Sequence, residues 1–323
     1  MIPSEDKFNG TYGELCLRFI AHKRSLGYAY TERQCYAVKY LNDYLSQSTS
    51  TTIRLSKELV EGFIKKKNGE APKSQAKRVF MVRQFGLFLI TLGYEVFLPP
   101  YQKIKINKSF TPYIFTKEEI DLIIKASEEI RPMNRGPNAC LVYPMLMRLL
   151  FGCGLRISEA LRLTAADVNL DEGILVVRQS KFNNSRLVPM SDSLLEYCRR
   201  YCRNMNFVFN SEKPEYLFPV ARGKPYGSRG IYGRFRYFLK QAGIAYGGRG
   251  QGPRLHDARH TFAVHALEQM VQNGLDIYCA LPVLSTYMGH RTMESTEQYV
   301  RLVPSAHMDI INAITAVRLI DEI

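Results

Sequence analysis

Two stretches near the end of the chain, PRLHDARHTFAVHALEQM (residues 253–270) and STYMGHRTMESTEQYV (residues 285–300), decide the fold prediction. In chain order they carry His256, Arg259, His290 and Tyr299. Paired carboxylates and cysteine clusters do not accompany these side chains in the sequence, so the set fits neither acid–base hydrolysis nor redox chemistry. It suits a reaction in which a phenol attacks a phosphodiester while nearby cations stabilise the negative charge that develops.

The first stretch predicts a helix with a cationic face. His256 and Arg259 are three residues apart, so they share one face of a helix that starts after the Gly252–Pro253 loop. His260 and His265 fall on the same helix, where packing is an equal alternative to a chemical role. His256 and His260 have the i, i+4 spacing of zinc ligands, but the Glu of a His-Glu-x-x-His motif is absent and no third ligand is apparent. We therefore expect no metal site.

The second stretch predicts a break between the last two site residues. His290 and Tyr299 are nine residues apart and would point to opposite sides of one unbroken helix. Gly289 offers a helix end, and Ser295-x-x-Gln298 has the form of a capping box that starts a new helix. A break of this kind would turn Tyr299 back toward His290.

The composition favours nucleic acid as a partner. The chain has 323 residues, enough for two domains, and 46% of them are hydrophobic, enough for real cores. The formal net charge is +14, and residues 1–111 hold 18 Lys and Arg against 9 Asp and Glu. A basic N-terminal part suits a DNA clamp; a membrane surface is the second candidate, and a merely solvated basic surface is the alternative without function.

The cysteines and the apolar runs predict a cytoplasmic protein associated with the bacterial nucleoid. The seven cysteines are scattered without a Cys-x-x-Cys pair, which is typical of reduced thiols. The N-terminal MIPSEDKFNG is acidic and polar, unlike a signal peptide. The most apolar run, Leu141–Leu155, is too short for a membrane span and contains Arg148, so we interpret it as a core helix.

Hydrophobic periodicity predicts a helical N-terminal domain over residues 1–105. Two helices within 11–48 join near Gly27, a third opens at Ser56 or Lys57 and ends near Lys67, and a fourth runs from Pro72 to Gly93. The fourth has an apolar face formed by Val79, Val82, Phe85 and Leu89. Its basic face, for which we expect DNA contact in preference to simple solvation, is formed by Lys73, Lys77 and Arg78.

After Leu98-Pro99-Pro100 the chain is Lys-rich and extended to about Pro112, and a linker at 106–112 leads to a second domain over 113–303, which Thr116-x-x-Glu119 opens with a capping box. Residues 174–178 and 186–188 predict a hairpin with Lys181 near its tip, although such lysines are commonly only solvated. Helices are expected over 191–206 and 231–239, and the arginines of the latter region available to DNA are Arg229, Arg234 and Arg236. An amphipathic helix over 304–320 packs in cis or docks on a neighbouring subunit.

The turn before residue 156 supplies a further cation. Gly152 and Gly154 expose Arg156 near a helix start, where Glu159 lies three residues on and can orient it. An arginine before an amphipathic helix is commonplace, so this segment alone is weak evidence of a site.

Together these segments resemble the tyrosine recombinase (phage integrase) family, in particular integrases carried by transposons. GCGLRISEAL (152–161) is similar to the first-arginine box, HDARHTFA (256–263) to the His-x-x-Arg box, and Gly289–His290 with Tyr299 to the last box. Lys181 stands where the hairpin lysine of the family belongs. The resemblance covers about 112–302; it departs from the family at Ala258 and in the long connection from His256 to His290.

The resemblance implies a mostly α fold with a small β-sheet (α+β), comprising a helical core-binding domain, a catalytic domain and a C-terminal helix at 304–323 that either packs in cis or is exchanged between subunits. It implies a site-specific recombinase that breaks and rejoins double-stranded DNA through a 3′-phosphotyrosyl bond, without metal or ATP. Tyr299 would be the nucleophile, and the phosphate would be held by Arg156, Arg259 and His290. Lys181 would protonate the leaving 5′-oxygen, His256 would assist proton transfer at the tyrosine, and Glu159 would support Arg156.

The implied partners are inverted-repeat core sites on DNA, a homotetramer formed on two duplexes, and an accessory DNA-bending factor. The expected biological setting is the movement of a mobile element. Two alternatives remain at this point: a type IB topoisomerase that relaxes DNA without a defined site, and a catalytically silent DNA-binding regulator.

Overall fold

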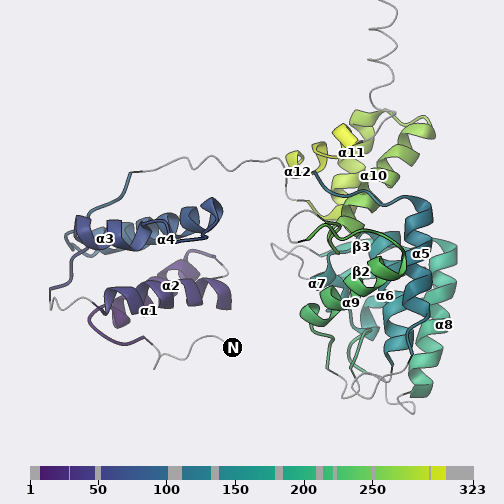
Figure 1. Ribbon diagram of the computed structural model, residues 1–323, viewed down its shortest axis with the longest axis horizontal. Helices are drawn as coiled ribbons and strands as arrows, with labels where there is room; N and C mark the ends of the chain where they lie inside the picture. Colours follow the sequence, from purple (N-terminus) through teal and green to yellow (C-terminus); the bar gives the residue numbers. More distant parts are fainter. Residues whose placement is uncertain are drawn as a thin grey trace, which may run out of the picture. The chain divides into compact units, whose positions relative to one another are not determined.

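The chain divides into two compact units, residues 1–110 and 111–323, which we call the N-terminal and C-terminal units (Figure 1). A computed structural model describes residues 8–28, 30–47, 52–100, 111–131, 138–178, 185–208, 214–220, 224–248, 252–290 and 292–302. Both units are helical apart from one small sheet, so the predicted mostly α fold with a small β-sheet is confirmed. The predicted linker at 106–112 lies largely outside the described residues.

The N-terminal unit contains the four predicted helices. They are α1 (Gly13–Ser25), α2 (Glu32–Leu45), α3 (Lys57–Ile64) and α4 (Pro72–Thr91). The Ser56 side chain caps α3 by accepting from the Leu59 backbone N–H at 3.3 Å, and Pro72 begins α4, where its missing N–H costs nothing. The predicted end of α3 near Lys67 was wrong, because Lys65 already leaves the helical conformation with a ψ of 128°.

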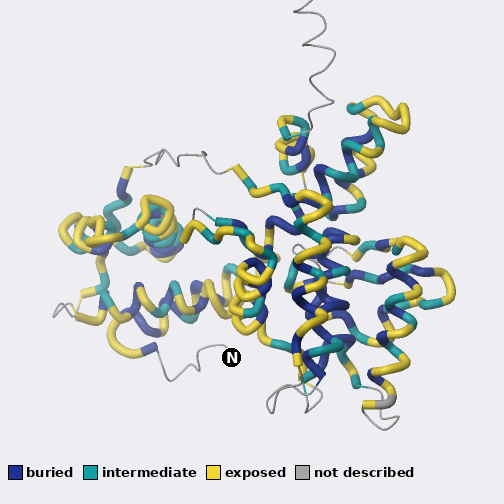
Figure 2. Tube along the Cα trace, turned by 45° about the vertical axis from the view of Figure 1, so that its right-hand side comes forward, coloured by how far each residue is buried: buried dark blue, intermediate teal, exposed yellow. Residues whose placement is uncertain are grey.

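Aromatic side chains hold these helices together. The Phe19 ring of α1 meets the Phe85 ring edge-on at 5.5 Å between centroids and the Phe88 ring at the same separation. Phe19 and Phe85 are fully buried, and the dark segments of Figure 2 mark such buried positions. The apolar face predicted for α4 is therefore its core face.

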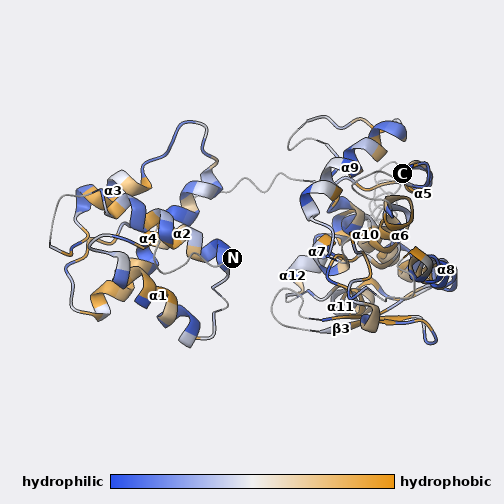
Figure 3. Ribbon diagram, turned by 90° about the horizontal axis from the view of Figure 1, so that it is seen from below, coloured by the Kyte–Doolittle hydropathy of each residue, from blue (hydrophilic) through white to orange (hydrophobic). Residues whose placement is uncertain are grey.

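The C-terminal unit is built around one apolar helix. α6 (Ala139–Cys153) packs between α5 (Lys117–Glu128) and α8 (Asp192–Val208), and α10 (Asp257–Gln272) crosses it. Figure 3 shows α6 in hydrophobic colours, whereas α8 shows both hydrophilic and hydrophobic residues. The core-helix interpretation of 141–155 is confirmed, and Arg148 turns outward to meet Glu128 at 2.6 Å. α5 begins with the predicted capping box between Thr116 and Glu119.

A three-stranded antiparallel sheet lies beside these helices in the order β1-β2-β3. β2 (Ile174–Val177) and β3 (Arg186–Pro189) form the predicted hairpin, with Val177 opposite Arg186 at the end next to the connecting loop. β1 (Val168–Asn169) adds a short strand that the sequence did not indicate. Lys181 lies outside the described residues.

Five helices complete the described part of the C-terminal unit, and the last three of them lie at one end of it (Figure 1). They are the short α7 (Ile157–Ala160), α9 (Ser228–Gln241), α10, α11 (Ile277–Met288) and α12 (Glu294–Glu297), of which α10, α11 and α12 pack in sequence. The predicted helix over 304–320 lies outside the described residues. Within the part of the chain that is described, each helix is too short or too polar to cross a membrane.

The capping box predicted at Ser295 and Gln298 was wrong. α12 begins at Glu294, with Met293 and not Ser295 at the N-cap position, so Ser295 lies inside the helix. The Gln298 side chain donates to the Ser295 carbonyl at 2.8 Å instead of reaching a helix start. The predicted break in the chain is nevertheless present, because α11 ends at Gly289 and α12 is a separate helix.

Replacing Phe85 by alanine should destabilise the N-terminal unit by about 3–5 kcal/mol, because the neighbouring helices cannot fill the volume of a fully buried ring. Urea unfolding of the full chain, with hydrogen exchange read over residues 13–91, measures this loss. Phe80→Ala is the matched control: it lies on the same helix, 60% exposed, and should change the unfolding free energy by less than about 0.5 kcal/mol. Equal destabilisation by both substitutions would contradict the assigned core.

Candidate functional site

The first predicted arginine lies at the turn between α6 and α7. The Arg156 backbone N–H donates to Glu159 Oε2 at 2.9 Å, and its Nη1 donates to Glu159 Oε1 at 2.6 Å. Arg156 Nη2 also lies 3.4 Å from the Gly289 carbonyl. One side chain thus joins the start of α7 to the end of α11.

Glu159 gathers three guanidinium groups on one buried carboxylate. Arg186 donates Nη1 to Oε1 at 3.1 Å and Nη2 to Oε2 at 2.9 Å, and Arg259 Nη1 lies 3.8 Å from Oε2. Burial alone would raise the pKa of Glu159, but the hydrogen bonds and charge of Arg186, together with the bonds from Arg156, lower this pKa to about 2. The carboxylate therefore stays ionised at neutral pH and fixes three cations in place.

Arg186 is a component of this site that the sequence analysis missed. Its Nε donates to the Tyr287 carbonyl at 2.8 Å, so it links β3 to α11 as well as to Glu159. The only signal in the sequence was a charged residue at the start of a strand in which Val188 is buried.

Arg259 is buried where α6, α10 and α11 meet. Its Nη1 donates to the Gly154 carbonyl at 2.8 Å and its Nη2 to the Met288 carbonyl, and only 2% of the residue is exposed. Burial and the charge of Arg156 lower the pKa of Arg259 to about 10, which still leaves it protonated at neutral pH. Arg259 thereby brings together the ends of two helices that carry other site residues.

Two glycines with left-handed backbone make these helix ends possible. Gly154 has φ 59° at the end of α6, and a Cβ there would lie 2.4 Å from the Phe262 ring. Gly289 has φ 63° at the end of α11, as predicted, and a Cβ there would lie 3.0 Å from Arg186 Cδ. Both positions need glycine for conformation, and Gly154 needs it for space as well.

Tyr299 turns back toward His290, as the predicted chain break required. The two rings stack with centroids 6.2 Å apart and planes 23° apart. His290 Nδ1 lies 2.8 Å from Thr296 Oγ1, which fixes the imidazole.

Burial shifts the pKa of both rings. Tyr299 is 1% exposed, and burial raises its pKa, although the charges of Arg259 and Arg156 offset part of this rise. Burial and the same two arginines lower the pKa of His290 to about 4, so its ring is neutral at neutral pH.

His260, rather than His256, meets the tyrosine hydroxyl. His260 Nδ1 lies 3.0 Å from Tyr299 Oη, whereas the His256 ring packs edge-on against His260 with centroids 4.9 Å apart. The sequence left packing and a chemical role equally open for His260, and in the structure this side chain makes a polar contact with Tyr299. Among the residues that the structure describes, His, Cys, Asp and Glu side chains do not gather in threes that could hold a metal ion.

The residues predicted to contact DNA differ in their exposure to solvent and in their contacts within the protein. Lys73 and Lys77 on α4 and Arg229 on α9 are exposed. Arg234 is half-buried with its guanidinium over the Tyr143 and Tyr237 rings. The basic face predicted for α4 needs a correction at Arg78, whose guanidinium pairs with Glu70 and also donates to the Phe63 and Lys65 carbonyls.

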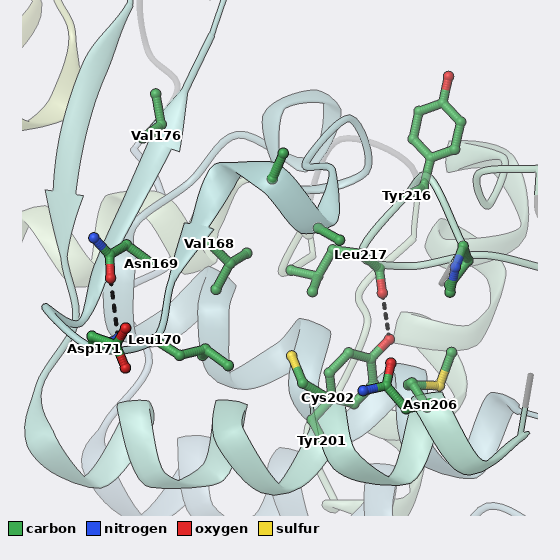
Figure 4. Close-up of a pocket in the computed structure, with 14 residues that line it drawn as sticks. Val168, Asn169, Leu170, Asp171, Val176, Tyr201, Cys202, Asn206, Tyr216 and Leu217 are labelled. Atoms are coloured by element: carbon green, nitrogen blue, oxygen red, sulfur yellow. Dashed lines mark hydrogen bonds between the residues drawn. The ribbon is translucent and has the colours of Figure 1, made fainter. Parts of the chain in front are cut away.

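A cavity of about 710 Å³ lies apart from these residues, between β1, β2 and α8 (Figure 4). Tyr201, Cys202 and Leu217 line it, and the Tyr201 hydroxyl donates to the Leu217 carbonyl at 2.6 Å. None of the predicted site residues that the structure describes lines this cavity. The chemistry of the candidate site therefore does not depend on it.

The Glu159 cluster predicts a pH dependence of stability. Because its pKa falls from the ordinary 4.5 to about 2 on folding, Glu159 contributes stability that is fully present above about pH 4.5 and is lost as the pH falls toward 2. A difference of this size corresponds to about 3 kcal/mol. Glu159→Gln should therefore be less stable at pH 7 and should show a shallower loss of unfolding free energy between pH 4.5 and pH 2.

Urea unfolding at several pH values measures this difference. Glu128→Gln, whose side chain is 45% exposed, is the control and should keep the slope of the unchanged protein. Identical slopes for the Glu159 variant and the unchanged protein would show that the carboxylate is not held by the three arginines.

Comparison with known proteins agrees with this arrangement. Residues 114–305 match the Phage integrase family. The chain is 30% identical over 298 residues to the "Putative integrase/recombinase y4rB" of Sinorhizobium fredii, covering 90% of this chain and 92% of that relative. It is 26% identical over 237 residues to the tyrosine recombinase XerD of Pseudomonas putida, covering 72% of each.

The fold is shared with the Tn1549 transposon integrase in complex with transposon right end DNA (TM-score 0.63, 16% identity, 88% of this chain and 94% of that chain). It is also shared with the XerH site-specific recombinase bound to palindromic difH substrate (TM-score 0.64, 16% identity, 86% of this chain and 77% of that chain). With its boxes, its fold and these relatives in agreement, the chain belongs to the phage integrase family.

Proposed function

We propose that this protein cuts and rejoins double-stranded DNA at specific sites through a transient 3′-phosphotyrosyl bond to Tyr299. The observation that carries this proposal is the position of the phenol, whose ring stacks on His290 and whose burial raises its pKa, a rise that the charges of Arg259 and Arg156 partly oppose. A nucleophile beside fixed cations is the arrangement that phosphoryl transfer requires. The relatives named above do not favour the topoisomerase and regulator alternatives.

The proposed reaction assigns one task to each charged group. Tyr299 Oη attacks the phosphorus, and Arg156, Arg259 and His290 donate to the non-bridging oxygens as their charge grows. Lys181 protonates the departing 5′-oxygen, and Glu159 holds Arg156 in place. The energy of the broken phosphodiester is kept in the phosphotyrosyl bond, so rejoining needs no ATP, and no step calls for a metal ion.

The role of His256 follows from its packing. Because the His256 ring lies against His260 and not against the Tyr299 hydroxyl, it assists proton transfer at the tyrosine only through its neighbour. Burial and the nearby charge of Arg259 lower its pKa, which keeps the ring neutral at neutral pH.

The proposed DNA complex uses both units. The exposed Lys73 and Lys77 of α4, together with Arg229 of α9, contact backbone phosphates on each half-site. Two duplexes with inverted-repeat core sites are joined by four copies of the chain, with the segment 304–323 exchanged between neighbours and an accessory factor bending the DNA. The setting is the cytoplasm of a bacterium, where the reaction moves a mobile element.

The direct test traps the protein on candidate element-end DNA that carries a nick near the crossover point, because loss of the short fragment prevents rejoining. Peptide mapping of the trapped adduct should identify Tyr299. A link at another residue, or no adduct with any element-end DNA, would contradict the proposal.

Tyr299→Phe should bind the same DNA with unchanged affinity and form no covalent adduct, because only the nucleophilic oxygen is lost. Gel-shift and denaturing gel assays on the nicked substrate measure the two properties. Tyr278→Phe, a substitution at a residue that is 80% exposed, should form adduct at the normal rate. Adduct formation by Tyr299→Phe would place the nucleophile elsewhere.

Arg156→Ala and Arg259→Ala should each slow adduct formation by on the order of 100-fold or more, because each removes one donor to the transition state. Arg259→Lys keeps the charge but loses the paired geometry, so it should also be slow. Single-turnover cleavage with saturating protein measures the rates, and Arg203→Ala, whose side chain is 67% exposed, is the control. Near-normal cleavage by either alanine variant would remove that arginine from the site.

A further inference from the structure

His260 occupies a place on α10 that none of the predicted roles explains. It follows Arg259 directly, and successive residues of a helix point about 100° apart, so the two side chains reach different partners. Arg259 reaches the carbonyls of Gly154 and Met288, on the phosphate-binding side of the site. His260 reaches the oxygen that attacks.

The contact between His260 and Tyr299 has the geometry of proton transfer. The 3.0 Å between Nδ1 and Oη is within hydrogen-bond reach, and the ring planes are tilted by 56° with centroids 5.6 Å apart. Within the described part of the chain, this is the hydrogen bond that the Tyr299 hydroxyl makes. Because Tyr299 is 1% exposed, bulk water has little access to take its proton.

The other two histidines are placed differently. His290 presents the face of its ring to the phenol, and its Nδ1 is held by Thr296. His256 stands behind His260. Of the three imidazoles, His260 alone aims a ring nitrogen at the phenol oxygen.

His260 is also in the protonation state that an acceptor needs. Burial, followed by the charges of His256, Arg254 and Arg259, lowers its pKa to about 4, so the ring is neutral at neutral pH and Nδ1 can carry a lone pair. Asp257 on the same helix acts in the opposite direction. A bound phosphodiester brings a negative charge that offsets the guanidinium charges and makes the imidazole more basic as the reaction begins.

We infer that His260 is the catalytic residue that takes the proton of Tyr299 during DNA cleavage, an inference that rests on the proposed function. The O–H bond of Tyr299 breaks as its proton moves to His260 Nδ1, and the oxygen forms the bond to phosphorus. The bond from phosphorus to the 5′-oxygen breaks, and that oxygen takes a proton from Lys181. On rejoining, the His260 proton returns to the departing phenol.

The test replaces His260 by asparagine, whose amide can hydrogen-bond to the phenol but cannot take its proton at neutral pH. Adduct formation on the nicked substrate should slow by on the order of 100-fold or more, with DNA affinity unchanged. His265→Asn, a substitution of a half-buried histidine farther along α10, is the matched control and should react at the normal rate.

A second reaction separates proton acceptance from phosphate binding. In a Tyr299→Phe background, a strand that ends in a 3′-(p-nitrophenyl phosphate) can be joined to a free 5′-hydroxyl, and p-nitrophenolate leaves without needing a proton. Adding His260→Asn to that background should change the joining rate by less than about twofold, whereas adding Arg156→Ala should slow it strongly. Normal joining also shows that the variant is folded, and His260→Gln replaces the asparagine variant if the latter melts early.

Two results would overturn the inference: normal adduct formation by His260→Asn, or equal slowing of both reactions by an asparagine or glutamine variant that melts normally. Failure of the proposed function looks different, because the unchanged protein would then form no adduct at Tyr299 on any element-end DNA.

Discussion

The Glu159 carboxylate is the constraint on which the rest of the site depends. Three guanidinium groups with little exposure to water repel one another, and each would be expensive to bury alone. One ionised carboxylate, bonded to Arg156 and Arg186 and close to Arg259, offsets part of that repulsion. Because three positive charges face one negative charge, the cluster keeps an excess of positive charge. A phosphodiester is the kind of anion that this excess accommodates.

Two backbone turns determine where this excess of positive charge lies. Gly154 ends α6 just before Arg156, and Gly289 ends α11 just before His290. Their carbonyls, with that of Met288, accept from the arginines, so the helix ends and the cations fix each other. A side chain at Gly154 would collide with Phe262 of α10 and push the end of α6 away from the helix that carries Arg259. The chemistry of the side chains is therefore tied to the conformation of two glycines.

Much of this arrangement could be predicted from spacing, and the failures have physical causes. The helix carrying His256 and Arg259, the break at Gly289 and the hairpin follow from local periodicity and turn residues, which act within a few positions. Arg186 could not be predicted, because its partners Glu159 and Tyr287 lie 27 and 101 positions away. For Arg78 the local pattern was misleading. Helical periodicity placed its guanidinium on the basic face predicted to contact DNA, but in the structure it forms a salt bridge with Glu70 in the loop before α4.

His260 shows why residue types alone did not rank the histidines. All three lie near the same arginines, and the sequence gives no reason to separate His256 from His260 at i and i+4. The distinction comes from the tertiary path of the chain after α12, which brings the phenol to His260 within α10 and not to His256 at the N-cap of that helix. Before DNA binds, Tyr299 is hydrogen-bonded to His260 and His290 to Thr296, so these buried polar groups have partners without an external anion. A phosphodiester then needs only to replace short protein contacts with its own oxygens, and donors already fixed in a desolvated place need little rearrangement as charge develops.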